Sequence, residues 1–112
     1  MDRERINAKK IARDYAKSIA SAVQVEEVVL FGSSARGQMR YDSDIDLIVL
    51  SPDFARMPLM ERLQLLNSMR RGSALQVPMD IIGLTAKEFA DLKKSESPNL
   101  RRIYKDARRV YP

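Results

Sequence analysis

Apolar residues recur along this chain of 112 residues with two different spacings, one typical of a helix and one typical of a strand. In residues 6–23 the apolar side chains fall three or four positions apart, with charged residues between them. The helical spacing returns in residues 57–72, where Pro58 suits a first helical turn and Gly72 suits the exit. Both segments are predicted to be amphipathic helices.

Runs of β-branched and other apolar residues predict three strands. They cover residues 25–31, residues 44–50 and residues 74–84, the last expected to be extended from Val77 onward. Gly32 ends the first run, and Ser51-Pro52 ends the second, because proline cannot donate to a ladder. Pro78 indicates that the third strand starts irregularly or lies at the edge of the sheet.

The C-terminal third of the chain is predicted to be mostly helical. Thr85 to Glu88 has the sequence of a capping box and should open a helix that continues through Leu92. A second short helix can begin at Ser97-Pro98 and run toward Ala107. The order of elements predicts one α/β domain, residues 1–112, with a small three-stranded sheet flanked by helices.

The composition excludes several classes of active site. There is no cysteine and no histidine, so disulfides, thiolate zinc sites, Ser-His-Asp triads and histidine-ligated metals are all excluded. Any metal must be held by oxygen ligands, which favours Mg²⁺, Mn²⁺ or Ca²⁺. No stretch approaches the ~20 apolar residues of a membrane helix, and the N-terminus is charged, so a cytoplasmic location is expected.

The charge balance is basic, with 20 Lys and Arg residues against 15 Asp and Glu residues. The resulting net charge of +5 suits contact with phosphates or with an acidic partner. A solvated basic surface on an ordinary soluble protein has the same composition, so charge alone does not decide between these alternatives.

Three aspartates are the main candidates for chemistry. Asp44 and Asp46 open the second predicted strand and project from one side of it, about 6.6 Å apart for a rise of ~3.3 Å per residue. Asp80 stands alone among apolar residues of the third predicted strand. If the two strands are neighbours, three carboxylates converge, and two divalent cations would balance their charge.

Two other interpretations of these acids were open. They could lie at a solvated strand entrance, or they could begin a calcium loop at Asp42. The calcium loop requires glycine at the position of Leu47 and a loop in place of the apolar run that follows, so it is rejected.

The segment after the first strand suits phosphate binding. Gly32 and Gly37 have the spacing of a Walker A loop, but Gln38 and Met39 follow where Lys and Ser or Thr are required. Gly32-Ser33 followed by a short helical turn still offers backbone N–H groups and a hydroxyl to phosphate oxygens. An ordinary turn has the same sequence, so this signal is weak by itself.

Taken together, these motifs resemble the polymerase-beta-type nucleotidyltransferase superfamily. The pattern is Gly32-Ser33, ten further residues, then Asp44-Ile45-Asp46 after an apolar strand, with Asp80 on a later strand. The likeness is closest to the minimal nucleotidyltransferases (MNT), small prokaryotic proteins often encoded beside a helical HEPN partner in toxin–antitoxin pairs. Other residues of the string that agree with this family are Arg36, Gly37 and Ser43.

The resemblance implies a polymerase-beta-like core with a mixed three-stranded sheet, and transfer of a nucleoside monophosphate, here AMP from ATP, to an acceptor hydroxyl. It implies that Asp44 and Asp46 hold two Mg²⁺ ions, with Mn²⁺ as an alternative, and that Asp80 binds the metal nearer the acceptor. Gly32 would let the backbone approach the triphosphate, and Ser33 would hydrogen-bond its oxygens. Arg36 is expected either to bind phosphate or to form a structural salt bridge.

The resemblance also bears on partners. A chain of this length has little room for an acceptor site of its own, which favours a hydroxyl on a HEPN-type partner and the role of antitoxin. The alternative is a non-catalytic binding module that neutralises its partner by occlusion. The basic residues of segment 92–112 are either a solvated face or a docking surface for an acidic partner or RNA. Too few aromatic residues accompany them for nucleic-acid binding to be favoured.

Overall fold

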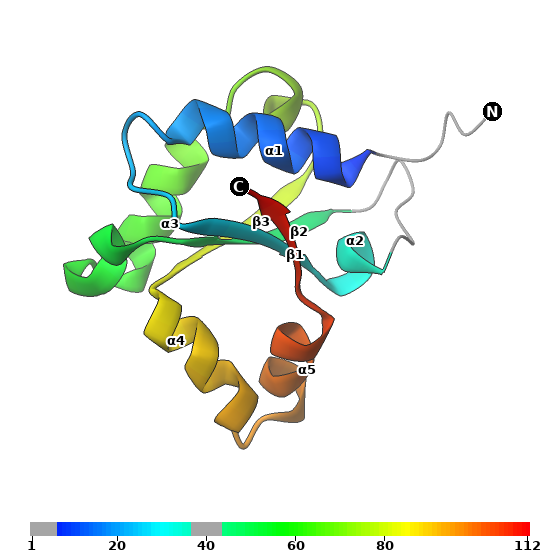
Figure 1. Ribbon diagram of the computed structural model, residues 1–112. Helices are drawn as coiled ribbons and strands as arrows, with labels where there is room; N and C mark the ends of the chain where they lie inside the picture. The colour runs from blue at the N-terminus through cyan, green and yellow to red at the C-terminus, as the bar shows by residue number, and fades with distance from the viewer. Residues whose placement is uncertain (1–6, 37–43) are drawn as a thin grey trace.

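The computed structural model describes residues 7–36 and 44–112 of the chain. Its order of elements follows the sequence prediction closely and adds one strand at the C-terminal end (Figure 1). The helices and strands are α1 (Ala8–Ile19), β1 (Glu27–Phe31), α2 (Gly32–Ala35), β2 (Ile45–Leu50), η1 (Pro52–Arg56), α3 (Leu59–Ser68), η2 (Gly72–Leu75), β3 (Met79–Leu84), α4 (Ala86–Asp91), η3 (Leu92–Lys94), α5 (Pro98–Asp106) and β4 (Arg108–Tyr111).

The sheet has four strands in the order β3-β2-β1-β4, and it is mixed. β1 is antiparallel to both of its neighbours, while β2 and β3 are parallel. Of the two alternatives that Pro78 left open, the edge position is confirmed, because β3 is an outer strand of the sheet that the described residues form. Residues 74–78 are not part of that strand, since η2 occupies Gly72–Leu75 and β3 begins at Met79.

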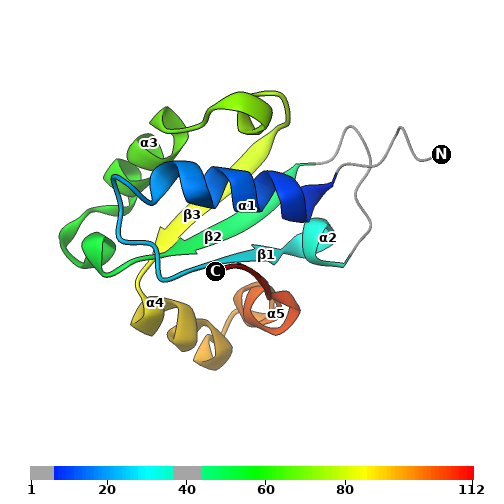
Figure 2. The same cartoon turned by 45° about the horizontal axis from the view of Figure 1, so that its top comes forward.

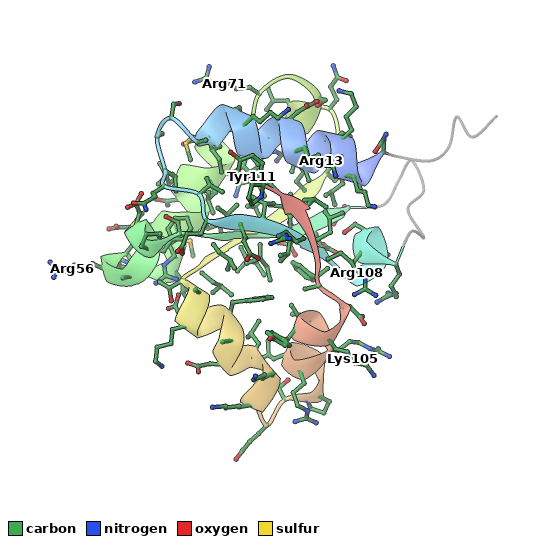
Figure 3. All side chains as sticks on the ribbon, viewed as in Figure 1. Arg13, Arg56, Arg71, Lys105, Arg108 and Tyr111 are labelled. Carbon is green, nitrogen blue, oxygen red and sulfur yellow. The ribbon has the colours of Figure 1, made fainter. Side chains whose placement is uncertain are left out.

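The prediction of a three-stranded sheet is wrong, because β4 pairs with β1. This strand has only four residues and begins with two exposed arginines, so it shows no apolar run in the sequence. Tertiary contacts make it a strand: Val110 is 3% exposed, and its carbonyl accepts a hydrogen bond from Arg13 Nε at 2.9 Å. Figure 3 shows Arg13 of α1 lying beside the C-terminal strand that carries Tyr111.

Helices cover both faces of the sheet (Figures 1 and 2). α1 and α3 lie on one face, and α4 and α5 lie on the other. Strand alternation divides the apolar side chains between these two layers. The first core contains Tyr15, Ile19, Val28, Leu30, Leu47, Val49, Phe54, Leu66 and Ile81 among others. The second, smaller core contains Val29, Phe31, Ile48 and Leu50, with Ile82, Leu84, Phe89 and Ile103 packed against it.

The predicted start of the helix at Thr85 is confirmed, whereas the predicted bounds of the helix in residues 57–72 are too wide. Thr85 and Glu88 form the expected capping box, with the Glu88 N–H donating to Thr85 Oγ1 and the Thr85 N–H donating to Glu88 Oε1. α3 is shorter than the predicted helix 57–72, because Pro58 is its N-cap and the chain leaves it at Met69. No helix within residues 7–36 and 44–112 is long and apolar enough to cross a membrane.

A buried arginine ties three elements together. Arg62 of α3 is 5% exposed, and its guanidinium donates to Met57 O at 2.8 Å and to Gly83 O at 3.0 Å. It also pairs with Glu88 of α4 at 2.7 Å and lies over the ring of Phe54. Gly83 and Glu88 are more than 20 residues away in sequence, so the charge pattern of the helix gave no sign of this burial.

Candidate active site

The turn between β1 and α2 is built around Gly32. Its φ of +61° lies in the left-handed region, which a residue with a side chain adopts only with strain. A Cβ at this position would lie 2.6 Å from Asp46 Oδ2, so the glycine also makes room for that carboxylate. The short helical turn predicted after Gly32-Ser33 is confirmed as α2.

Ser34 connects this turn to β2. Its side chain is buried, and the hydroxyl donates to Phe31 O at 2.7 Å and accepts the Asp46 N–H at 3.3 Å. Sequence reasoning did not single out Ser34, although a second serine after Gly32-Ser33 was a visible signal. The result is that the glycine turn and the backbone of Asp46 are held together.

The structure places Asp46 and Asp80 side by side. The two residues are direct partners in the parallel register of β2 and β3, so their side chains project from the same face. That face is the one covered further along by α4 and α5, since Ile48 and Ile82 follow two positions later. Asp44 is exposed and lies one residue before β2, two positions from Asp46. The two strands are neighbours, as the convergence requires, and the register brings together Asp46 and Asp80, whereas convergence of all three carboxylates stays a prediction.

The carboxylates influence one another. The pKa of Asp46 is raised from an ordinary 3.8 to about 6, first by partial burial and then by the negative charges of Asp80 and Asp44. Arg36 acts in the opposite direction. A bound cation would remove the electrostatic part of this penalty.

The donor set suits a hard divalent cation. Carboxylate oxygens are the ligands of Mg²⁺ and Mn²⁺, and the exposed side chains of Asp44 and Asp80 have room to turn toward Asp46. In the conformation described, no three such side chains of the described residues surround a single point closely enough to hold an ion. One or two carboxylates together with water and substrate phosphates are the usual ligands of Mg²⁺, so a preformed group of three is not required.

Arg36 forms a salt bridge with Asp106 at 2.9 Å. Of its two expected roles, structural pairing is the one seen, although its partner comes from the end of α5 rather than from within the turn. Lys105 and Arg108 are close to Asp106 in sequence and lie at the same end of α5 (Figure 3), where Arg108 donates to the backbone carbonyls of Asp106 and Ala107. Gly37 and Ser43, which contributed to the family resemblance, lie outside the described residues, as does Asp42.

A mixed sheet with paired aspartates beside a glycine turn is the arrangement expected of a nucleotidyltransferase, and the sequence comparisons agree. The profile of the nucleotidyltransferase domain family matches residues 10–111, and the chain belongs to this family. A relative in Methanocaldococcus jannaschii is 31% identical over 92 residues, which is 82% of this chain and 90% of the relative. That relative bears the name "Putative protein adenylyltransferase MJ1379".

Two solved structures share the fold. One is described as a "putative nucleotidyltransferase" from Sulfolobus solfataricus, with a TM-score of 0.63 and 24% identity, covering 91% of this chain and 78% of that one. The other is described as "toxin-antitoxin with AMP-PNP", with a TM-score of 0.55 and 20% identity, covering 95% of this chain and 73% of that one. The resemblance to nucleotidyltransferases stated from the sequence is confirmed.

Proposed function

We propose that this nucleotidyltransferase transfers AMP from ATP to a hydroxyl group of a partner protein, in a reaction that depends on a divalent metal. The observation that carries the proposal is the direct pairing of Asp46 with Asp80, next to a glycine turn that packs against Asp46. The relative named as a protein adenylyltransferase supports AMP as the transferred group and a protein as the acceptor.

The proposed transfer forms one bond and breaks one. The acceptor oxygen bonds to the α-phosphorus of ATP, and the bond from that phosphorus to the oxygen bridging to the β-phosphate breaks, so pyrophosphate leaves. Asp80 accepts the proton of the acceptor hydroxyl, while Gly32 and Ser33 border the triphosphate. Asp44, Asp46 and Asp80 would hold Mg²⁺, which when bound would supply positive charge near the attacking and leaving oxygens.

The partner we propose is a HEPN-type protein, for which this chain is the antitoxin. The structural neighbour described as a toxin–antitoxin with an ATP analogue is compatible with this assignment, although at 20% identity it supports the fold alone. The partner itself is proposed from the sequence resemblance.

The test combines purified protein, Mg²⁺, ATP labelled on the α-phosphate and the product of a neighbouring HEPN-type reading frame. Label should appear on the partner and should vanish in Asp44→Ala/Asp46→Ala. Asp91→Ala, at an exposed position of α4, serves as the matched control and should retain transfer. If neutralisation of the partner stays undiminished in the double variant, occlusion rather than chemistry is the mechanism.

A further inference from the structure

The apolar stripe of α3 continues past the edge of the sheet. Leu59, Leu63 and Leu66 lie on one face of the helix, at positions i, i+4 and i+7. Leu66 is fully buried beneath Gly83 of β3, whereas Leu63 is 40% exposed and Leu59 is 65% exposed. The described part of the sheet therefore covers only one end of this stripe.

The strand at that edge is β3, and no described strand pairs with its outer side. The carbonyls of Pro78 and Leu84 accept hydrogen bonds from the N–H groups of Ile45, the first residue of β2, and of Ser51, the residue after it. The residues between these, at odd-numbered positions of β3, point their backbone N–H and C=O groups away from β2. Gly83 is an example, because its carbonyl accepts a hydrogen bond from Arg62. By the same alternation, the N–H and C=O groups of Met79 and Ile81 face the open edge.

A pocket of about 260 Å³ lies along this edge. Its lining is Leu59, Leu63, Asp80, Ile81, Ile82 and Gly83. Four consecutive β3 residues line it, and their side chains alternate between the two faces of the sheet. Leu59 and Leu63 lie on the face of Ile81, and the carboxylate of Asp80 lies on the other. Asp80 belongs both to the pocket lining and to the candidate active site, so the two are adjacent.

We propose that this edge binds an extended segment of the acceptor protein as a fifth strand, with an apolar side chain between Leu59 and Leu63. The inference rests on the proposed function and adds to it how the acceptor is recognised. Backbone hydrogen bonds to Met79 and Ile81 would supply affinity, and the pocket would supply specificity, as in other cases of strand addition. The segment then passes directly beside Asp80.

The lining favours a polypeptide over a nucleic acid. Among the described residues that line the pocket, Asp80 alone is charged, and its negative charge repels phosphates. The nearby cation, Arg62, is already engaged by Glu88 and by two backbone carbonyls. A second copy of this chain is also disfavoured, because pairing β3 with β3 would bring the two Asp80 carboxylates toward each other and cover the site.

The pleat of the added strand makes a specific prediction about the acceptor sequence. The apolar side chain must face α3, and the hydroxyl must face the Asp80 side. Neighbouring residues on a strand project to opposite faces, so the apolar residue should be directly adjacent to the hydroxyl residue. An apolar residue two positions away would project to the wrong face.

Two peptides of equal composition test this prediction. Both are acetylated decapeptides of alanine and glutamine with one central tyrosine and two leucines. In the adjacent peptide the leucines flank the tyrosine directly, and in the spaced peptide they lie two positions away on each side. Binding is measured by fluorescence anisotropy without ATP, and transfer is measured separately with α-labelled ATP and Mg²⁺.

The adjacent peptide should bind and be labelled about tenfold better than the spaced peptide. Leu59→Asp/Leu63→Asp should abolish that preference while leaving the Mg²⁺-dependent thermal shift by a non-hydrolysable ATP analogue unchanged. Both leucines are exposed, so the variant should fold. Leu75→Asp is the matched control, because Leu75 is 64% exposed and does not line the pocket.

Several results would overturn the proposal that the outer edge of β3, here called the docking edge, binds the acceptor. These are equal binding of the two peptides, no binding of the adjacent peptide at millimolar concentration, or a dimer in sedimentation that Leu59→Asp/Leu63→Asp dissociates. Failure of the proposed function would give a different result. The adjacent peptide would bind, and Leu59→Asp/Leu63→Asp would weaken that binding, yet neither the peptide nor the partner protein would be labelled. In that case the docking edge stands without the chemistry.

Discussion

Replacing Gly32 by alanine tests whether the glycine turn exists to admit the Asp46 carboxylate. Gly72 offers an internal control, because its φ of +57° is nearly the same as the +61° of Gly32. An alanine Cβ at residue 72 meets nothing within 4 Å, whereas at residue 32 it lies 2.6 Å from Asp46 Oδ2. The two substitutions therefore share the backbone strain and differ in the contact.

The strain can be given a magnitude. An alanine in the left-handed region destabilises the folded state by about 1–2 kcal/mol. Replacing glycine also lowers the conformational entropy of the unfolded chain, which offsets about 0.4–1 kcal/mol of that loss. Gly72→Ala should thus lower the free energy of unfolding by about 1 kcal/mol, or Tm by roughly 4 °C. Gly32→Ala should cost about 0.5–1.5 kcal/mol more, because the Asp46 side chain must leave its rotamer.

The functional effects should differ far more than the stabilities. A displaced Asp46 carboxylate should weaken metal-dependent nucleotide transfer by tenfold or more, the order seen when the support of a metal ligand is lost. Gly72→Ala should transfer label at the wild-type rate. Urea unfolding at neutral pH and transfer from α-labelled ATP provide the two measurements. Equal transfer by the two variants would refute the assignment of Gly32 to the site.

Three further predictions concern single side chains. Because the pKa of Asp46 is raised to about 6 in the folded protein, its charge costs stability above that pH, and the cost disappears as the pH falls toward 4. Asp46→Asn should therefore stabilise the metal-free protein at pH 7.5 by about 1–2 kcal/mol after solvent screening, with no gain near pH 4. Glu88→Gln keeps an acceptor for the capping box but leaves the buried Arg62 without its anion, so unfolding should become easier by about 2 kcal/mol. The hydrogen bond from Arg62 holds the pKa of Glu88 below its ordinary 4.5, so this contribution is present above pH 4.5 and is lost as the pH falls below that value. Tyr15→Phe removes the buried 2.7 Å hydrogen bond to Leu66 O and should cost about 1–2 kcal/mol at neutral pH.

Each of these has an outcome that contradicts it in urea unfolding curves. For Asp46→Asn, Glu96→Gln at an exposed site is the control for lost charge, and equal stabilisation by both would remove the role of the neighbouring acids. For Glu88→Gln, a loss that persists unchanged at pH 3 would mean that the ion pair is not its source. A Tyr15→Phe variant as stable as the wild type would show that the Leu66 carbonyl finds another donor.

Local chemistry explains what could be predicted from the sequence. Three predicted features depend on residues within a few positions of one another. They are the helix predicted in residues 6–23, within which α1 lies, the capping box at Thr85 and the end of β1 at Gly32. The chemistry proposed for the site comes from composition, since without histidine and cysteine a metal would have to be held by oxygen ligands such as carboxylates. The glycine motif and the spacing of the aspartates carried the family resemblance, and that resemblance is confirmed.

Only the tertiary structure decided which distant segments meet. β4 forms because β1 offers an open edge and Val110 fills the core, whereas its own four residues include only two strand formers, Val110 and Tyr111. The burial of Arg62 depends on carbonyls and a carboxylate that reach it from other elements. The pairing of Asp46 with Asp80 and the exposed edge beside them are likewise fixed by strand order, because hydrogen bonding between strands carries no signal in local sequence.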